Sequence, residues 1–200
     1  MKINADQVFF GIEIPLDRFS DLAAAHLARV KHTADIEALG GLLIKRRFPK
    51  TDAAEFVCRV CAWGGYAGVS GRVQKHNEPA EIRRSLSEAQ GQLTASPPNI
   101  ASALQAVNRL WGLGQLSFAS KHLRFLCPDL CPVFDSFLQS ALPYSFNAEG
   151  YAGFASDCGR LAAELTRLRV RNPRPGRRGR WLVADAEASI YEYVRQRASR

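Results

Sequence analysis

One lysine is set apart by its position in the chain. Lys121 is the only lysine after residue 75, in a stretch where 15 arginines supply the other positive charges. Arginine stays protonated in proteins, so it binds anions but cannot act as an amine nucleophile. A lysine that has lost its proton, through burial or a neighbouring cation, can attack a carbon atom and form a Schiff base. Lys121 is therefore the candidate nucleophile.

A carboxylate follows Lys121 at the start of the next expected helix. Asp135 lies 14 residues further on, directly after the apolar segment 132–134. A carboxylate there could stabilise a developing sugar cation or orient a nucleophile. Each residue also has an ordinary interpretation, Lys121 as the solvated edge of an amphipathic helix and Asp135 as a helix N-cap. Spacing alone does not choose between these interpretations.

Residues 63–77, WGGYAGVSGRVQKHN, form a second group of interest because they combine four glycines with aromatic and polar side chains. A base that leaves a duplex needs aromatic faces to stack on and polar groups that read its edge. Trp63 and Tyr66 could supply the faces, and Arg72 and Asn77 the hydrogen bonds. The alternative is a helix C-cap followed by a flexible turn, with Trp63 in the core.

Cysteine and histidine spacing gives no support for a metal site. Cys58 and Cys61 could combine with Cys127 and Cys131 into one four-thiolate zinc site. Neither pair lies in a glycine-rich knuckle, so we expect these cysteines to be small buried hydrophobic residues. The four histidines show no metal-ligand spacing. We expect no metal and no cofactor. The five cysteines are Cys58, Cys61, Cys127, Cys131 and Cys158.

The positive charge is concentrated near the end of the chain. The net charge is +8, of which residues 1–159 contribute +1 and residues 160–200 contribute +7. Seven of the fourteen residues in 167–180 are arginine, interleaved with proline and glycine. Such a loop can contact phosphates or enter a groove, so double-stranded DNA is the leading partner, although RNA or an acidic protein would also fit. The candidate DNA-binding residues here are Arg171, Arg174, Arg177, Arg178 and Arg180.

Helical periodicity dominates the chain and must position these residues. Apolar residues recur at i, i+3 and i+4, and two short segments, 8–15 and 180–184, could be β-strands. This pattern predicts an all-α fold with at most minor β elements. We expect residues 1–200 to form one domain, or two helical subdomains with a cleft between them. Helices are expected at 16–30, 36–44, 53–63, from 77–79 onward, 100–110, 117–126, 133–142, 148–169 and 184–197.

The apolar runs do not suggest export or membrane insertion. No run approaches the ~20 residues that a membrane span needs. The first residues, MKINADQVFFGIEI, contain acids where a secretory signal would be apolar. We therefore expect a cytoplasmic protein, with no membrane partner and no obligate protein partner.

The segment SFASKHLRFLCPDLCPVFDSFL at 117–138 resembles the part of helix-hairpin-helix DNA glycosylases that carries their catalytic lysine and aspartate. It is most similar to bacterial proteins with the 8-oxoguanine DNA glycosylase fold, some of which are phage-defence enzymes that remove glucosylated hydroxymethylcytosine. The resemblance implies catalytic roles for Lys121 and Asp135. Gly112 and Gly114 resemble the glycines of the hairpin, whose amides hold a DNA phosphate. The hairpin is degenerate, because seven positions separate Gly114 from Lys121.

The resemblance implies a DNA glycosylase that flips out and excises a modified base and leaves an abasic site. Glucosylated hydroxymethylcytosine of phage DNA is the expected base, with or without cleavage of the strand by lyase activity. One alternative is a repair glycosylase/lyase of the 8-oxoguanine type. The other is a basic DNA-binding module without catalysis.

Overall fold

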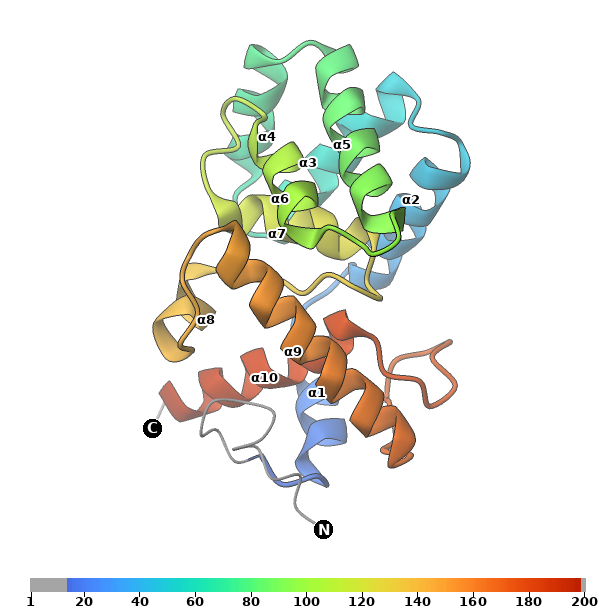
Figure 1. Cartoon of the computed structure of the whole chain (residues 1–200), viewed down its shortest axis with the longest axis vertical. Coiled ribbons are helices and arrows are strands. Elements are labelled where there is room, and N and C mark those ends of the chain that lie inside the picture. The colour runs from blue at the N-terminus through green and yellow to red at the C-terminus, as the bar shows by residue number, and fades with distance from the viewer. Residues whose placement is uncertain (1–13, 199–200) are drawn as a thin grey trace.

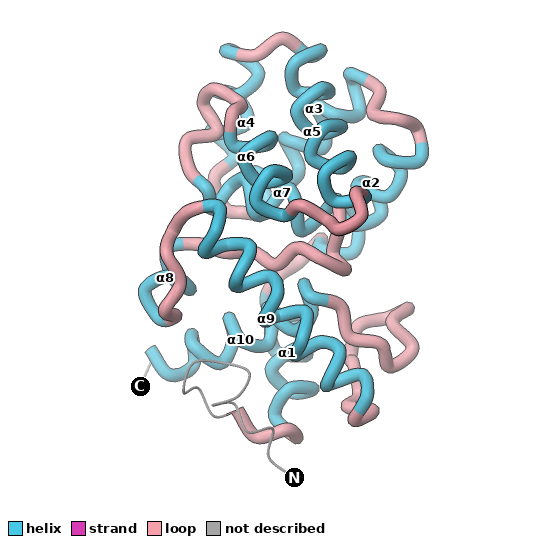
Figure 2. Tube along the Cα trace, in the orientation of Figure 1, coloured by secondary structure: helices cyan, strands magenta, loops and turns pink. Residues whose placement is uncertain are grey.

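Helices account for the regular structure in the part of the chain that the computed structural model describes, residues 14–198. These residues form ten helices and no strand (Figure 1, Figure 2). The prediction of an all-α fold is therefore confirmed. Of the two expected β segments, 180–184 is the end of a loop and the first turn of the last helix, and most of 8–15 lies outside the described residues.

The helices gather in two groups, an upper and a lower one in Figure 1. The first group contains α2 (Thr33–Lys45), α3 (Lys50–Trp63), α4 (Ala67–His76), α5 (Pro79–Thr94), α6 (Ile100–Asn108) and α7 (Leu116–Leu126). The second contains α1 (Arg18–Arg29), α8 (Ser136–Ala141), α9 (Ala148–Arg167) and α10 (Val183–Ala198). Helix α6 packs on α5 and α7 in the first group and on α9 in the second, whereas α10 packs on α1 and α9.

Helix α4 is the main departure from the expected secondary structure. The glycines of this region predict a turn, yet Ala67–His76 is helical. Val69 and Val73 lie four residues apart on one face, both are buried, and α4 packs on α3. Burial of this face outweighs the cost of Gly68 and Gly71, about 1 kcal/mol each relative to alanine.

Side-chain caps begin several helices. The Oδ1 atom of Asn99 accepts a hydrogen bond from Ser102 N at 3.0 Å and caps α6, and that of Asn147 accepts one from Gly150 N at 2.8 Å and caps α9. The expected helix 133–142 is shorter than predicted and begins at Ser136. The preceding residues are held extended against α7.

The hydroxyl of Ser120 fixes this extended segment. Ser120 is fully buried on α7, and its Oγ accepts a hydrogen bond from Phe134 N at 3.0 Å. Tyr151 of α9 donates from its hydroxyl to Pro132 O at 3.0 Å. The segment that ends at Asp135 is therefore bound on one side to α7 and on the other to α9. Its contact on α7, Ser120, directly precedes Lys121.

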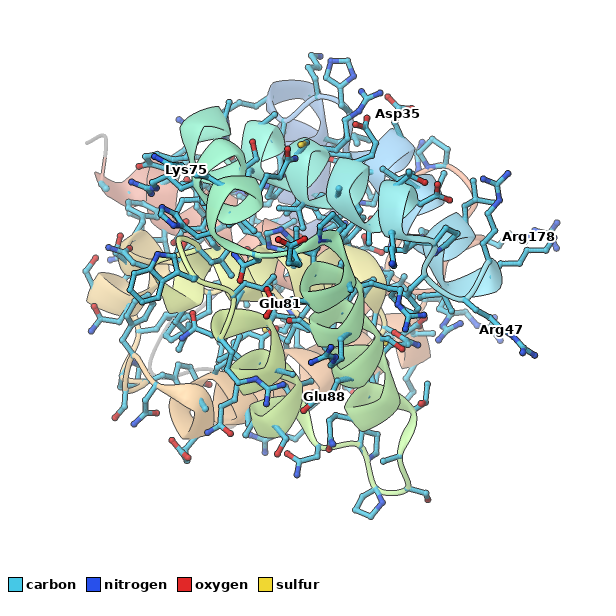
Figure 3. The ribbon with its side chains drawn as sticks, turned by 90° about the horizontal axis from the view of Figure 1, so that it is seen from above. Asp35, Arg47, Lys75, Glu81, Glu88 and Arg178 are labelled. Atoms are coloured by element: carbon cyan, nitrogen blue, oxygen red, sulfur yellow. The ribbon has the colours of Figure 1, made fainter. Side chains whose placement is uncertain are left out.

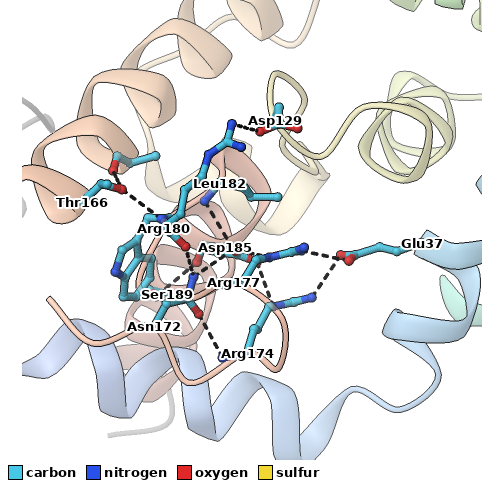
Figure 4. Close-up of polar contacts among 12 residues, drawn as sticks. Glu37, Asp129, Thr166, Asn172, Arg174, Arg177, Arg180, Leu182, Asp185 and Ser189 are labelled. Atoms are coloured by element: carbon cyan, nitrogen blue, oxygen red, sulfur yellow. Dashed lines mark hydrogen bonds and ion pairs between the residues drawn. The ribbon is translucent and has the colours of Figure 1, made fainter. Parts of the chain in front are cut away.

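A buried network of ion pairs joins the two groups of helices (Figure 4). Glu37 of α2 accepts hydrogen bonds from Arg174 Nη1 at 3.1 Å and Arg177 Nη2 at 2.8 Å. Asp185 of α10 lies 2.9 Å from the Nε atom of each of the same two arginines. Arg124 of α7 also pairs with Glu37, at 2.7 Å. The arginine-rich loop is thereby bound to α2 and α10.

This network corrects two of the DNA-binding assignments. The guanidinium groups of Arg174 and Arg177 face carboxylates inside the protein, and Arg174 is only 7% exposed. These two arginines hold the loop rather than extend from it. Arg171 and Arg178 are exposed, and Figure 3 shows Arg178 at the edge of the molecule, pointing outward. Arg180 is exposed too and pairs with Asp129.

The lengths and polarity of the helices show whether any of them could cross a membrane. Among the described residues, no helix combines the length and the apolar character needed to span a bilayer.

Candidate active site

A cavity of about 730 Å³ lies where the two groups of helices meet. One side is lined by residues of α3, α4 and α7, and the other by residues of α1, α10 and the segment around α8. Lys121 and Asp135 both line it, so the residues paired in the sequence belong to one site. Besides His26, the acidic and basic side chains of the lining are Arg29, Arg72, Lys121, Arg124, Asp135 and Glu187.

The amine of Lys121 is in a largely dehydrated position. The residue is 7% exposed, and Nζ donates a hydrogen bond to Ser117 Oγ at 2.7 Å. Burial lowers the pKa of Lys121, while the carboxyl groups of Asp135 and Glu187 oppose the shift. The solvated-edge interpretation of Lys121 is wrong, because every residue of α7 from Ser117 onward is buried. A lowered pKa favours the neutral, nucleophilic amine.

Asp135 caps α8 and also lines the cavity. Its Oδ1 atom accepts a hydrogen bond from Leu138 N at 3.0 Å, which caps α8. Within the described residues, Oδ2 makes no hydrogen bond, and the side chain is half-buried in the cavity wall. The cap fixes the orientation of the carboxylate, and one oxygen remains available to face a cation in the cavity.

The two glycines that follow Trp63 have different structural roles, and Gly64 makes room for Lys121. A Cβ atom at Gly64 would lie 3.0 Å from Lys121 Cδ and 3.3 Å from Cε. The stem of Lys121 therefore passes directly over this backbone position, at a distance that a side chain would disturb. Gly65 has φ +82°, in the region that favours glycine, and turns the chain toward α4.

Aromatic side chains line both sides of the cavity. Tyr66 and Phe118 come from the first group of helices, with ring centroids 5.4 Å apart and planes at 83°. Phe137 and Tyr191 come from the second group, with centroids 5.2 Å apart. Tyr66 is 62% exposed, so it lies at the opening. These four rings provide apolar surface for a flat ligand.

Trp63 has a different environment from the one expected for a stacking residue. Its Nε1 donates to Thr33 Oγ1 at 3.1 Å, and its ring meets that of Phe125 edge-on at 4.9 Å. The residue lines the cavity but is mostly held by α2 and α7. Arg72 also lines the cavity and is exposed, as a base-contacting residue would need to be.

Asn77 does not belong to the cavity, and its assignment to a base pocket is corrected. Its Nδ2 donates to Trp111 O at 2.8 Å, and its Oδ1 accepts from Trp111 N at 3.1 Å. Nδ2 also lies 2.7 Å from Val73 O. Both ends of the amide are therefore engaged by the backbone. The side chain ties the end of α4 to the turn between α6 and α7.

That turn contains the two glycines of the expected hairpin. Gly112 and Gly114 have φ values of +83° and +88°. A Cβ atom at Gly112 would lie 3.0 Å from the backbone of Arg72, so Gly112 also permits close packing against α4. Gly114 lines the cavity. Helix, turn and helix are present in the expected order, and α6 packs on α7.

Glu187 is the site residue that the sequence analysis missed. It lines the cavity from α10, is 4% exposed, and accepts a long hydrogen bond of 3.4 Å from Val133 N. Burial, helped by Asp135, raises the pKa of Glu187 to about 8, against the opposing effect of Arg124. A signal was present in the sequence, since Glu187 lies at helical spacing from Val183 and Ile190, on the apolar face.

His26 lines the same cavity from α1 and was not singled out either. Burial, together with the nearby Arg174, Arg29 and Arg124, lowers its pKa to about 3. The imidazole is therefore neutral at physiological pH. Its ring stacks edge-on against Tyr191, with centroids 5.9 Å apart.

The cysteines lie outside this chemistry. All five are free thiols, and those at 61, 131 and 158 are buried among apolar neighbours, where burial raises the pKa of each thiol. Within residues 14–198, no three side chains of the metal-ligating types come together. The site therefore has an amine, two carboxyl groups and aromatic walls as its chemical resources.

Comparison of the chain with models of known protein families, with curated proteins and with solved structures gave no match.

Proposed function

We propose that the protein is a DNA glycosylase that binds a flipped-out modified base in this cavity and cleaves its N-glycosidic bond. The observation that carries the proposal is the meeting of Lys121 and Asp135 in one cavity, with the amine buried and its pKa lowered. A Schiff-base nucleophile needs a neutral amine, and a departing base leaves positive charge on the sugar that a carboxylate can stabilise. The site offers both groups.

The aromatic walls support a base as the ligand. An extruded base gains from stacking on aromatic faces and from polar groups at its edge. The paired rings of Tyr66 and Phe118 and of Phe137 and Tyr191 supply the faces. Arg72 at the opening can donate hydrogen bonds to the edge of a base.

The size and polarity of the cavity favour a bulky substrate. Its volume of about 730 Å³ lies well inside the range of small-molecule sites, about 300–1,000 Å³. A flat base can fill the aromatic part, and polar groups such as Ser117, Ser136 and Gln115 remain for the hydroxyls of an attached sugar. We therefore place glucosylated hydroxymethylcytosine first and an oxidised purine second.

A panel of three duplexes tests the function. Duplexes with one glucosylated hydroxymethylcytosine, one unglucosylated hydroxymethylcytosine or one 8-oxoguanine are incubated with the protein, and the released base is identified by mass spectrometry. We expect release from the glucosylated duplex. Release only from the 8-oxoguanine duplex would assign a repair enzyme instead. Binding to all three without release of any base would contradict a glycosylase and favour a non-catalytic DNA-binding module.

The exposed arginines Arg171 and Arg178 of the loop should bind the DNA backbone. In the double variant Arg171→Ala/Arg178→Ala, the slope of log affinity against log salt should fall by about 2, because each phosphate contact contributes about 0.9. Fluorescence anisotropy with an unmodified duplex measures it between low and moderate salt. Arg83→Ala/Arg84→Ala removes the same charge from exposed positions of α5. Equal slopes for the two double variants would show that the loop has no special role.

Gly64→Ala should reduce activity without unfolding the protein. The new methyl group would displace the flexible stem of Lys121 rather than backbone, so stability should change little while the amine moves. A displacement of about 1 Å at a reacting group can cost about 100-fold in rate. The measurement is the single-turnover rate of base release. Gly68→Ala is the control, since a Cβ there meets open space, and equal rates for the two variants would contradict the packing argument.

A further inference from the structure

Helix α10 carries three buried carboxyl groups, of which Asp185 and Glu192 have arginine partners and Glu187 does not among the described residues. Asp185 is 0% exposed and lies against the guanidinium groups of Arg174 and Arg177. Glu187, two residues further on, is 4% exposed and has no ion-pair partner within the described part of the chain. From residues 14–198, the one hydrogen bond that its side chain receives comes from Val133 N, at 3.4 Å. The network that explains Asp185 therefore does not explain Glu187.

A carboxylate without a cation is costly to bury, and the usual outcome is that it keeps its proton. The nearby guanidinium groups of Arg124 and Arg174 are directed at Glu37 and, for Arg174, also at Asp185. Replacing a functionless buried Glu by an apolar residue would remove this cost. The location of Glu187 in the wall of the cavity, opposite the helix that carries Lys121, suggests a use for the proton.

We propose that Glu187 is the general acid of this site and transfers its carboxyl proton to the departing base. This inference rests on the proposed glycosylase function. It assigns a role to a residue that lies 66 positions from Lys121 in the sequence.

The surroundings of Glu187 favour its protonated form. Burial raises the pKa of Glu187 to about 8 and lowers that of Lys121, so the carboxyl group keeps a proton while the amine tends to lose one. Arg174 of the loop, and Tyr151 and Cys158 of α9, also interact with Glu187. The charged or titratable groups that line the cavity with Glu187 are His26, Arg29, Tyr66, Arg72, Lys121, Arg124, Asp135 and Tyr191. His26 is neutral, because its pKa is about 3.

The proposed step balances in protons and electrons. The lone pair of the Lys121 amine forms a bond to C1′ of the sugar, and the electron pair of the N-glycosidic bond leaves with the base. The carboxyl proton of Glu187 passes to the departing base, which is released neutral. The alkylated amine then loses a proton to the Glu187 carboxylate, which restores the acid form. Asp135 faces the positive charge that develops on the sugar while the bond to the base breaks and the bond to the amine forms.

The variant Glu187→Gln tests the role of the general acid separately from that of the Lys121 nucleophile. With the duplex that the parent protein cleaves, we expect the variant to slow base release by about 10² to 10⁴, the usual contribution of a general acid. Borohydride trapping on a duplex with an abasic site needs Lys121 but no departing base, so trapping should fall far less. In the parent, release should also decline as pH rises through about 8, and this limb should be missing in the variant. Glu55→Gln, at an exposed position of α3, is the control.

A second readout does not depend on DNA. Because the pKa of Glu187 is raised from 4.5 in the folded state, the unfolded chain binds fewer protons between pH 4.5 and about 8. Stability of the parent should therefore fall across this range relative to Glu187→Gln, as followed by thermal unfolding.

Each outcome supports or overturns the inference. A difference in stability between the parent and Glu187→Gln that does not change with pH would overturn the proposal that Glu187 holds a proton. This conclusion would stand even if the protein releases no base. Equal losses of release and trapping would make Glu187 a positioning residue for Lys121 and also overturn it. Failure of the parent both to release base and to be trapped would instead contradict the proposed function.

Discussion

Replacing Lys121 by glutamine is expected to abolish both base release and the covalent complex with DNA. Glutamine is shorter than lysine by one methylene and keeps an uncharged polar end, but it has no amine that could attack C1′. Loss of a covalent nucleophile typically costs at least about 10³-fold in rate. The measurements are single-turnover release from the cleaved duplex and the yield of the borohydride-trapped complex on denaturing gels.

The fold should survive this change. The pKa of Lys121 is lowered in the folded state, so at neutral pH the buried lysine costs stability that an uncharged residue does not. Lys121→Gln should therefore unfold at the same temperature as the parent or slightly higher. Lys75→Gln is the matched control, because Lys75 is an exposed lysine on α4 (Figure 3). A Lys121→Gln protein that releases base and is trapped as well as the parent would refute the role of this lysine.

Replacing Asp185 by asparagine is expected to be the most destabilising of these changes. The carboxylate is fully buried and lies 2.9 Å from both Arg174 and Arg177. An asparagine of the same shape would leave two buried guanidinium groups with Glu37 as their remaining carboxylate partner. Breaking a buried pair by removing one charge costs about 3–5 kcal/mol. Chemical denaturation monitored by circular dichroism at 222 nm measures the free energy of unfolding.

An exposed ion pair from the same loop provides the control. Asp129 pairs with Arg180 at the surface, where both side chains are about half exposed or more. Exposed pairs of this kind contribute about 0–1 kcal/mol, so Asp129→Asn should be close to neutral. If the two variants lose the same small amount of stability, then the network around Asp185 does not hold the loop to α10.

The network matters for the site as well as for stability. Arg124 lines the cavity on one side and pairs with Glu37 on the other, at 2.7 Å. Glu37 in turn binds the loop that leads into α10, the helix that carries Glu187. The relative position of Lys121 and Glu187 therefore depends on the ion pairs that hold α7, α2 and α10 together.

Local patterns in the sequence were sufficient for the fold class and for part of the site. The period of apolar residues is a property of each segment, so most helices and two of their asparagine caps could be predicted without knowledge of their neighbours. Lys121 and Asp135 could be singled out by residue type and spacing. Their meeting in one cavity required the fold, because it depends on the hydrogen bonds between Ser120 and the segment before Asp135.

The same limit explains the incorrect assignments. The seven arginines of residues 167–180 look alike in sequence, yet Arg174 and Arg177 face Glu37 and Asp185 while Arg171 and Arg178 face solvent. Asn77 looked like a base reader and proved to hold the backbone of Trp111. The partners in these contacts lie from 8 to 140 residues apart along the chain, most of them well beyond the reach of any local pattern.

The sequence by itself determined an all-helical chain, a concentration of positive charge near residues 167–180, and one lysine that could act as an amine. The tertiary structure decided which of these charged groups are buried, which are paired and which remain free. The physical reason is that the free energy of ionising a side chain depends on its hydration and on the charges around it. Both are set by helices that meet only in the folded protein, which is why the environment of Glu187 could not be predicted from its own segment.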